Sequence, residues 1–369
     1  MRILYLMFSY TVGGTERLVT DICNDLVLKN NDVHLYIVND LIDDTMIQRV
    51  NPRVHIKKYG RTVGSRDKCK VLFELANYIK KEKIEIVHCN ALNTPELLLV
   101  AKIMTPHVKV IYTIHGMNQY GQLNEWKIRY RNIICDQIIA ISESVKKDII
   151  NAGAIQKKVK VVYNAIDFKR VDGSLTENRV FDKNNVVIGN VARFEPEIKG
   201  QDILLDAMEK LVKTYPNIKC LFAGAPDKSH QEQYTRLKNK MEKQYPSNIL
   251  FMGNVDDIAD FLRKIDIFVL PSRFEGFGLS LVEAMAMEVP CIASKLAGPE
   301  EVLEYGKRGC LFETENSSEL VSKIEYVIEN YSEEKCKAQE NESYVRTKYN
   351  IGNMTEQLIC IYEGENICN

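Results

Sequence analysis

Short apolar runs alternate with longer amphipathic stretches along the chain. In the first half, runs rich in β-branched and aromatic residues predict strands, and stretches with apolar residues three or four apart predict helices. The strands are expected at 2–8, 32–38, 84–90, 108–115, 137–142 and 159–165, with helices at 16–29 and 68–82. Strands that alternate with helices are typical of a doubly wound parallel sheet.

The same alternation begins again near residue 185. Strands are expected at 185–192, 219–225, 249–255, 265–271 and 289–295, and helices near 201–214, 228–243, 256–264, 278–288 and 317–330. Residues 167–185 are polar and aperiodic, so they are predicted to link two domains. We expect an N-terminal domain over 1–170, a C-terminal domain over 171–345, and a helical segment over 346–369 that packs back on the first domain.

Composition excludes several classes of protein. The apolar share of 45% and the charged share of 27% are ordinary for a globular protein, and no apolar run approaches the roughly 18 residues of a membrane span. The opening MRILYLMFSY is interpreted as a first buried strand because no cleavage site follows it. The ten cysteines are scattered, which favours reduced thiols and a cytoplasmic location. No C-x-x-C or H-E-x-x-H spacing occurs, so no structural metal site is expected.

The two halves differ in charge. Residues 1–170 carry 26 Lys and Arg against 17 Asp and Glu, whereas the remainder carries 23 against 33. A basic half indicates either an acidic partner, such as a membrane surface, or attraction between the two halves. No nucleic-acid-binding motif accompanies the basic residues, so nucleic acid is not an expected partner.

Two glutamates stand eight residues apart in PSRFEGFGLSLVEAMA (271–286). Glu275 is expected on the loop that follows strand 265–270, and Glu283 one to two turns inside the next helix. Ligands of open parallel sheets bind at this edge, and paired carboxylates can accept hydrogen bonds from a hydroxyl-rich ligand. The spacing alone is equally compatible with a solvated loop residue and a glutamate that caps a neighbour.

Two cations follow the first strand of the second half. Arg193 and Lys199 stand six residues apart across a loop that leads into a helix near Gln201. An arginine, a lysine and a helix start can together hold a diphosphate. A solvated charged loop is the alternative.

Two features of the first half are expected at the same edge of its own sheet. Gly13 and Gly14 separate the first strand from the first helix, where glycines let the backbone approach a ligand or merely form a tight turn. His115 ends the strand at 108–115 and precedes Gly116, whereas His34, His55 and His107 have no comparable setting. The glycines do not form G-x-G-x-x-G, which disfavours a nicotinamide-dependent dehydrogenase.

Taken together, these segments resemble the GT-B retaining glycosyltransferases of family 4. The resemblance rests on GGTE, TIHG, IIAISES, VVYNAID, FMGNV and above all LPSRFEGFGLSLVEAMA, and it covers nearly the whole chain. It implies an α/β fold with two Rossmann-like doubly wound domains that face a central cleft. It also implies transfer of a hexose from a nucleotide-diphosphate sugar to a saccharide or polyprenyl-linked glycolipid in surface polysaccharide or glycolipid synthesis. The expected donor is a UDP-sugar.

The resemblance also implies roles for individual residues. Glu275 would contact the sugar hydroxyls, Glu283 the ribose, and His115 the transferred sugar, while Arg193 and Lys199 would neutralise the leaving diphosphate. The remaining donor contacts would come from backbone or loop positions, namely Gly14, Asn254, Val255, Phe277, Gly278 and Leu279. Ala165, Ala225 and the single glycine of AGPEEV (297–302) depart from the family pattern, which bears on the nucleotide that is bound.

The chain contains no D-x-D, so no metal or other cofactor is expected on the diphosphate. The resemblance implies a same-face reaction in which the leaving phosphate takes the acceptor proton, rather than a carboxylate nucleophile.

The segment NEWKIRYRN (124–132) interleaves aromatic and basic residues. This pattern suits anionic lipid headgroups on the inner face of a membrane, although Trp126 and Tyr130 could instead pack inward and leave the arginines in water. Two other functions remain open from the sequence: a GT-B-fold sugar-nucleotide epimerase and a transferase-like subunit without activity.

Overall fold

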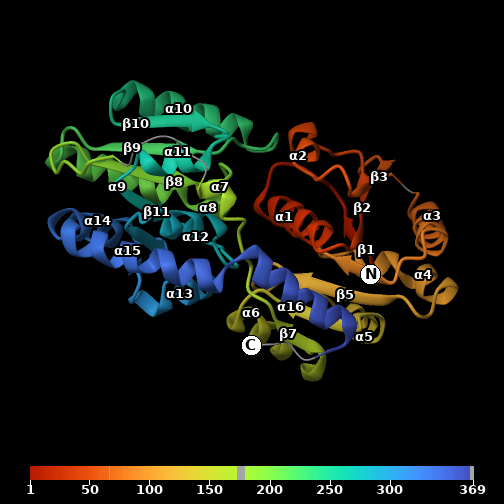
Figure 1. The fold of residues 1–369 in the computed structure, drawn as a ribbon. Helices are drawn as coiled ribbons and strands as arrows, with labels where there is room; N and C mark the ends of the chain where they lie inside the picture. The colour runs from red at the N-terminus through yellow and green to blue at the C-terminus, as the bar shows by residue number, and fades with distance from the viewer. Residues whose placement is uncertain (66, 173–178, 366–369) are drawn as a thin grey trace. The chain divides into compact units, whose positions relative to one another are not determined.

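A computed structural model describes residues 1–65, 67–172 and 179–365. The chain divides into two compact units, of which unit 1 comprises Met1–Ile166 and Ile351–Asn369, and unit 2 comprises Asp167–Asn350. The boundary thus falls at 166/167 rather than 170/171, and the chain returns to unit 1 at residue 351 rather than 346. Figure 1 shows both units as sheets flanked by helices.

Unit 1 is built on a parallel sheet in the order β3-β2-β1-β4-β5-β6-β7. Its strands are β1 (Arg2–Met7), β2 (Asp32–Asn39), β3 (His55–Arg61), β4 (Ile86–Cys89), β5 (Lys109–Ile114), β6 (Gln137–Ala140) and β7 (Val159–Val161). Its helices are α1 (Gly14–Leu28), α2 (Asp44–Gln48), α3 (Lys68–Lys81), α4 (Leu99–Met104), α5 (Glu125–Ile134), α6 (Glu143–Asn151) and α16 (Ile351–Glu363). The central strands are almost continuously buried because helices cover both faces of the sheet.

Unit 2 repeats this architecture in the order β10-β9-β8-β11-β12-β13. Its strands are β8 (Val187–Val191), β9 (Lys219–Ala223), β10 (Ile249–Gly253), β11 (Ile267–Leu270), β12 (Cys291–Ser294) and β13 (Cys310–Phe312). Its helices are α7 (Lys169–Asp172), α8 (Pro196–Lys199), α9 (Gln201–Thr214), α10 (Gln231–Gln244), α11 (Ile258–Arg263), α12 (Leu279–Ala286), α13 (Ala297–Val302), α14 (Ser317–Glu329) and α15 (Tyr331–Lys348). The two doubly wound α/β sheets confirm the predicted fold class.

Helix α16 belongs to unit 1 although it is the last element of the chain. The buried Tyr362 hydroxyl lies 2.7 Å from the Tyr5 hydroxyl and 2.5 Å from Nδ1 of His88. Lys29, the residue that follows α1, donates to the Gly352 carbonyl at 2.6 Å. These contacts fix the helix against β1, β4 and α1, and Figure 1 shows α16 beside α1.

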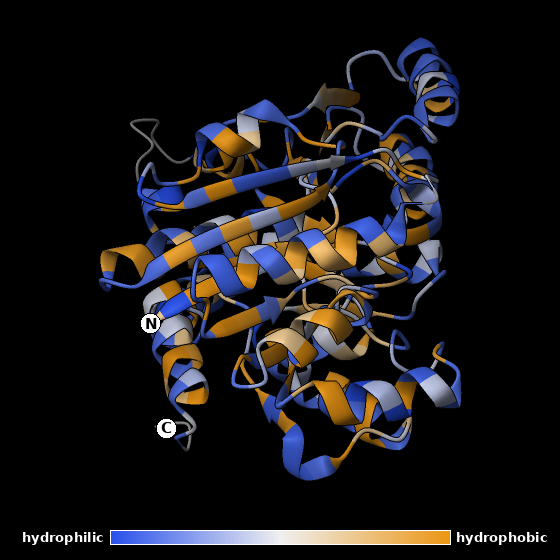
Figure 2. Cartoon of the chain, turned by 90° about the vertical axis from the view of Figure 1, so that its right-hand side faces the viewer, coloured by the Kyte–Doolittle hydropathy of each residue, from blue (hydrophilic) through white to orange (hydrophobic). Residues whose placement is uncertain are grey.

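The sequence pattern missed several short helices, and it also missed β3, β13 and α15 and misjudged one connection. Strand β3 is an edge strand with exposed lysines, β13 is short, and α15 has polar residues on nearly all sides, so none of them has a clear apolar period. The predicted linker at 167–185 is wrong where the structure describes it. Helix α7 occupies 169–172, and Arg179 Nε donates to Asp266 Oδ2 at 3.0 Å; residues 173–178 lie outside the described residues. Figure 2 shows how polar and apolar positions mix within single helices and strands.

Candidate active site

The candidate site of unit 2 lies where the strand order reverses. Strands β8 and β11 are parallel neighbours, and the chain continues from them toward opposite edges of the sheet. The loops after such strands diverge and leave space for a ligand at the carboxyl edge. Arg193 follows β8 and Glu275 follows β11, so the structure brings the predicted cations and the first glutamate to one edge.

Gly200 determines how the loop after β8 meets the loop after β11. It has φ of +64° and separates α8 from α9. A Cβ at this position would lie 1.9 Å from the Pro271 carbonyl oxygen, so the two backbones approach more closely than any side chain permits. The close contact positions Lys199, the residue before Gly200, beside the loop that carries Glu275.

Lys199 and Glu275 form an ion pair in this site. Lys199 Nζ donates to Glu275 Oε2 at 2.8 Å, and the two side chains are only 23% and 14% exposed. The Ser272 hydroxyl lies 3.5 Å from the same carboxylate oxygen. A partly buried ammonium and a partly buried carboxylate therefore neutralise each other.

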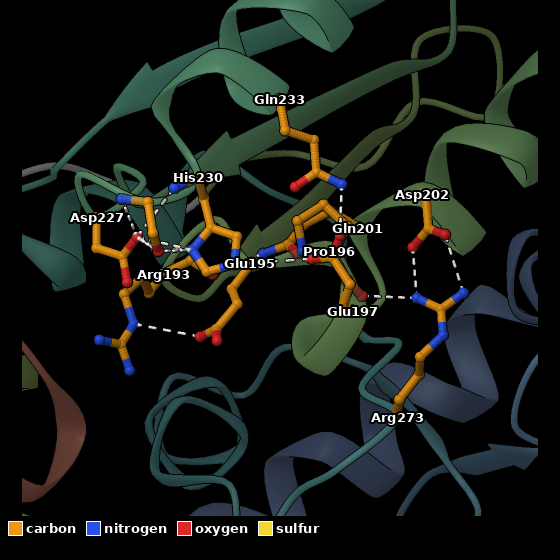
Figure 3. A network of polar contacts seen from close by, with 11 residues as sticks. Arg193, Glu195, Pro196, Glu197, Gln201, Asp202, Asp227, His230, Gln233 and Arg273 are labelled. Atoms are coloured by element: carbon orange, nitrogen blue, oxygen red, sulfur yellow. Dashed lines mark hydrogen bonds and ion pairs between the residues drawn. The ribbon is translucent and has the colours of Figure 1, made fainter.

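The backbone of Arg193 is fixed by a hydrogen bond, whereas its side chain is accessible to solvent. Its carbonyl accepts a hydrogen bond from the buried Gln201 amide at 2.8 Å, and its guanidinium lies 3.6 Å from Glu195 while remaining 45% exposed. Figure 3 shows this network together with Arg273, whose guanidinium binds both Asp202 oxygens at 2.7 and 2.9 Å. Arg273 thus anchors the start of α9, a role that the sequence did not reveal.

Helix α12 begins at the same edge. Gly278 has φ of +96° and precedes Leu279, the first helical residue, and as a glycine it offers no side chain to cap the backbone N–H groups of this helix start. Phe277 is buried against the Tyr349 ring. A Cβ on Gly298 would lie 2.5 Å from the Gly276 carbonyl, so the glycine that AGPEEV retains is needed where α13 packs against this loop.

Glu283 lies in α12 as predicted, but it has a partner that the sequence did not indicate. Its side chain is 7% exposed, and Arg170 Nη2 of α7 binds its Oε1 at 2.6 Å. Arg170 lies in the tract at 167–185 that the sequence predicts as a linker, and no pattern there distinguishes it from its charged neighbours. The bland interpretation of Glu283 as a cap is therefore replaced by a buried ion pair.

Asn254 and Val255 follow β10, two strands away from β8. Asn254 accepts a hydrogen bond from the Ala225 backbone N–H at 2.9 Å. Gly224 fits against the loop after β8, because a Cβ there would lie 1.9 Å from the Ala192 carbonyl oxygen. The loops after β8, β9 and β10 are consequently held together.

In unit 1, the predicted residues follow strands β1 and β5. Gly13 caps α1 with extended backbone and Gly14 is its exposed first residue. His115 follows β5, and its Nε2 lies 3.2 Å from Oδ1 of the buried Asn90, which follows β4. Since β1, β4 and β5 are consecutive neighbours, these residues also lie at a carboxyl edge beside a reversal of strand order.

Burial lowers the pKa of His115 to about 4, so its imidazole is neutral at neutral pH. Burial and the nearby His115 lower the pKa of His88 to about 3. His88 Nε2 contacts the Thr113 hydroxyl at 2.7 Å. A neutral His115 can donate or accept a hydrogen bond, but it supplies no positive charge to a diphosphate.

Helix α5 corrects one expectation about the aromatic and basic segment. Trp126 is 65% exposed and Ile133 is 80% exposed, so Trp126 does not pack into the core. Arg131 is instead completely buried, with its guanidinium 2.7 Å from Glu96 Oε1 and 3.2 Å from the Tyr112 hydroxyl. Among the described residues, no helix is both long and apolar enough to cross a bilayer.

Two family models match consecutive parts of the chain. The one described as "Glycosyltransferase Family 4" matches residues 12–170, and the one described as "Glycosyl transferases group 1" matches residues 174–346. The chain is a GT-B glycosyltransferase of family 4. The predicted family is thereby confirmed.

Several relatives of this glycosyltransferase are known. It is 26% identical over 355 residues to the capsular polysaccharide biosynthesis glycosyltransferase CapM of Staphylococcus aureus, which covers 90% of each chain. It is 26% identical to N-acetyl-alpha-D-glucosaminyl L-malate synthase of Bacillus anthracis, over 82% of this chain and 81% of the relative. The structure of Anabaena Alr3699/HepE in complex with UDP and glucose has a TM-score of 0.82 at 21% identity, over 98% and 99% of the two chains. That likeness shows the shared fold.

Proposed function

We propose that this glycosyltransferase transfers a hexose from a UDP-sugar to a saccharide or polyprenyl-linked saccharide with retention of configuration, without a metal on the diphosphate. The observation that carries the proposal is the Lys199–Glu275 pair at 2.8 Å, with Arg193 on the neighbouring loop and a helix start beside it. The HepE complexes with UDP and with UDP-glucose support a uridine nucleotide as the donor. The name of the relative CapM, a capsular polysaccharide biosynthesis glycosyltransferase, supports a role in polysaccharide synthesis.

The cations supply the charge that the diphosphate requires. As the bond between the anomeric carbon and the phosphate oxygen breaks, negative charge grows on that oxygen. Lys199 would turn from Glu275 toward it, and the exposed Arg193 guanidinium would bind further phosphate oxygens. The uncapped N–H groups at Gly278 and Leu279 would add positive potential. The absence of D-x-D from the sequence supports this division of labour.

The carboxylates position the donor. Glu275, released from Lys199, would accept hydrogen bonds from sugar hydroxyls, with Phe277 fixing the loop by its buried ring. Glu283 would accept hydrogen bonds from the ribose hydroxyls, while Arg170 holds the Glu283 side chain in place. Asn254 and Val255 would meet the base, and Gly14 and His115 would contact diphosphate and sugar respectively.

The acceptor hydroxyl would attack the anomeric carbon on the face that the diphosphate leaves. One carbon–oxygen bond forms as the other breaks, and the hydroxyl proton passes to the departing phosphate oxygen, so no enzyme nucleophile is needed. The exposed Trp126 and Ile133 on α5, with the exposed Arg129 between them, favour a membrane-bound acceptor and contact with an anionic lipid surface on the cytoplasmic side.

A transfer assay tests the proposal. Purified protein is incubated with a UDP-hexose and a bacterial lipid extract, and both UDP release and labelled glycolipid are measured with EDTA present. We expect UDP release that depends on the extract, persists in EDTA, and falls strongly in Glu275→Ala. Sugar inversion without UDP release would instead identify an epimerase, and donor binding without turnover under any acceptor would identify an inactive subunit.

A further inference from the structure

Two histidines and an aspartate meet at the edge of the unit 1 sheet that is opposite to Gly14 and His115. Asp32 opens β2 and His34 lies two residues later on the same face, while His55 opens β3 and is the direct cross-strand partner of His34. The three residues therefore gather at the amino ends of two adjacent strands. The transferase chemistry proposed above uses none of them.

Their ligand atoms have the spacing of a metal site. His34 Nε2 and His55 Nε2 lie 3.4 and 3.3 Å from the same Asp32 oxygen, Oδ1, and the three ligand atoms all lie within 4.8 Å of one another. Zinc bonds of about 2.0–2.1 Å in a tetrahedron place neighbouring ligand atoms about 3.3 Å apart. The two distances from Asp32 Oδ1 to the histidine nitrogens, 3.4 and 3.3 Å, match this value.

The surroundings orient His34 as a ligand. Its side chain is 6% exposed, and its Nδ1 lies 2.8 Å from the Tyr78 hydroxyl of α3. Within the part of the chain that the structure describes, its buried Nε2 has no hydrogen-bond partner, although Asp32 Oδ1 lies 3.4 Å away. A nitrogen without a hydrogen-bond partner is available to a metal ion, and a hydrogen-bonded outer nitrogen is usual for metal-bound histidines.

The two carboxylate oxygens of Asp32 face different partners. Arg2 Nε lies 3.3 Å from Oδ2, so Oδ1 is the oxygen that faces the imidazoles. The three ligands line a polar surface pocket whose rim includes the exposed Lys57, Lys81 and Lys83. Salt largely screens the charges of exposed lysines at distances beyond about 8 Å, so they weaken a cation site without closing it.

We propose that Asp32, His34 and His55 bind one Zn²⁺ ion, with the fourth position open to the pocket. Two imidazoles and a single carboxylate oxygen favour zinc over Mg²⁺ or Ca²⁺, which prefer sets of oxygens. The ion joins β2 to β3, an edge strand that has β2 as its one neighbour in the sheet. The ion would have a structural role, away from the residues proposed to bind the nucleotide sugar. This site departs from the sequence-based expectation that no metal site exists.

Cobalt titration of the reduced, untagged full chain tests the site. Co²⁺ can replace Zn²⁺ and gives visible d–d bands. A cobalt ion bound by cysteine also gives a sulfur-to-cobalt charge-transfer band, which a site made of histidine and aspartate lacks. We expect one nitrogen- and oxygen-bound Co²⁺ per chain that Zn²⁺ displaces. Zinc at a hundredfold excess over Kd should raise the Tm of unit 1 by roughly 5 °C. His55→Gln and Asp32→Asn should weaken binding at least about 10-fold and abolish the shift.

Matched controls keep the result interpretable. His55 is 63% exposed, so its substitution should not prevent folding, and His107→Gln removes another exposed histidine of the same unit and should bind as the unmodified chain does. UDP-sugar binding should be the same in all these proteins. Equal metal binding by His55→Gln, thiolate bands alone, or a Tm rise with inorganic phosphate but not with zinc would overturn the proposal.

Discussion

Replacing Lys199 by methionine separates a catalytic cation from a structural ion pair. The substitution keeps most of the side-chain volume but removes the ammonium group 2.8 Å from Glu275. Both partners are less than a quarter exposed, so the loss is only weakly moderated by solvent. The carboxylate of Glu275 then keeps the Ser272 hydroxyl at 3.5 Å as a weak contact.

Two magnitudes follow from this geometry. Loss of a charge-assisted hydrogen bond lowers the free energy of unfolding by about 1.5–3 kcal/mol. Loss of a preorganised group that stabilises charge in the transition state costs about 2.7–4 kcal/mol, or roughly 100- to 1000-fold in kcat. Urea unfolding measures the first quantity, and UDP release at saturating donor measures the second.

A double-mutant cycle distinguishes the two roles. In Lys199→Met/Glu275→Gln, no unpaired carboxylate remains, so much of the stability should return while turnover stays low. Lys210→Met is the control, because Lys210 is an exposed lysine of α9 that donates to serine hydroxyls. Turnover of Lys199→Met within about threefold of the unmodified enzyme, or full recovery in the double variant, would refute the assignment of Lys199 to the leaving diphosphate.

Two further predictions concern stability. Gly200→Ala should destabilise unit 2 by at least about 3 kcal/mol in urea unfolding, because the new Cβ would clash with the Pro271 carbonyl. Gly253 has a similar φ of +66° with nothing near its Cβ position, so Gly253→Ala should cost only about 1 kcal/mol. Equal losses in the two variants would contradict the close approach of Gly200 to Pro271. The folded-state pKa values of His115, about 4, and His88, about 3, lie below the ordinary histidine value of 6.5. The unfolded chain therefore binds more protons, and unit 1 should lose stability as pH falls from about 6.5 toward 3. Urea unfolding at several pH values checks this, and a flat profile across that range would show that the two imidazoles are not held neutral.

The strand and helix pattern predicted most of the fold because buried parallel strands form clear apolar runs. Expected strand 265–271 and helix 278–288 became β11 and α12 with shifts of a few residues at their ends. The exposed β3 and the polar α15 could not be found in this way, because their stability depends on neighbours rather than on an apolar face of their own.

The candidate site was partly visible in the sequence. Glu275 and Lys199 could be placed on loops at one sheet edge, but their direct contact depends on the close approach of Gly200 to Pro271, which only the fold provides. The Arg170–Glu283 pair joins residues 113 positions apart, and Arg170 lies in a tract without periodicity. Such a pair has no local signal.

The central claim is that unit 2 binds a uridine diphosphate sugar through the carboxyl edge of β8 and β11. Calorimetric titration with UDP-, GDP- and ADP-hexoses tests it most directly, with Arg193→Ala, Glu283→Gln and the control Lys210→Met in parallel. The account predicts one UDP-hexose per chain, weaker binding of the other nucleotides, a loss of affinity of about 10-fold or more in the two site variants, and no change in the control. Equal affinity in Arg193→Ala and the unmodified protein, or no binding of any nucleotide sugar, would contradict it.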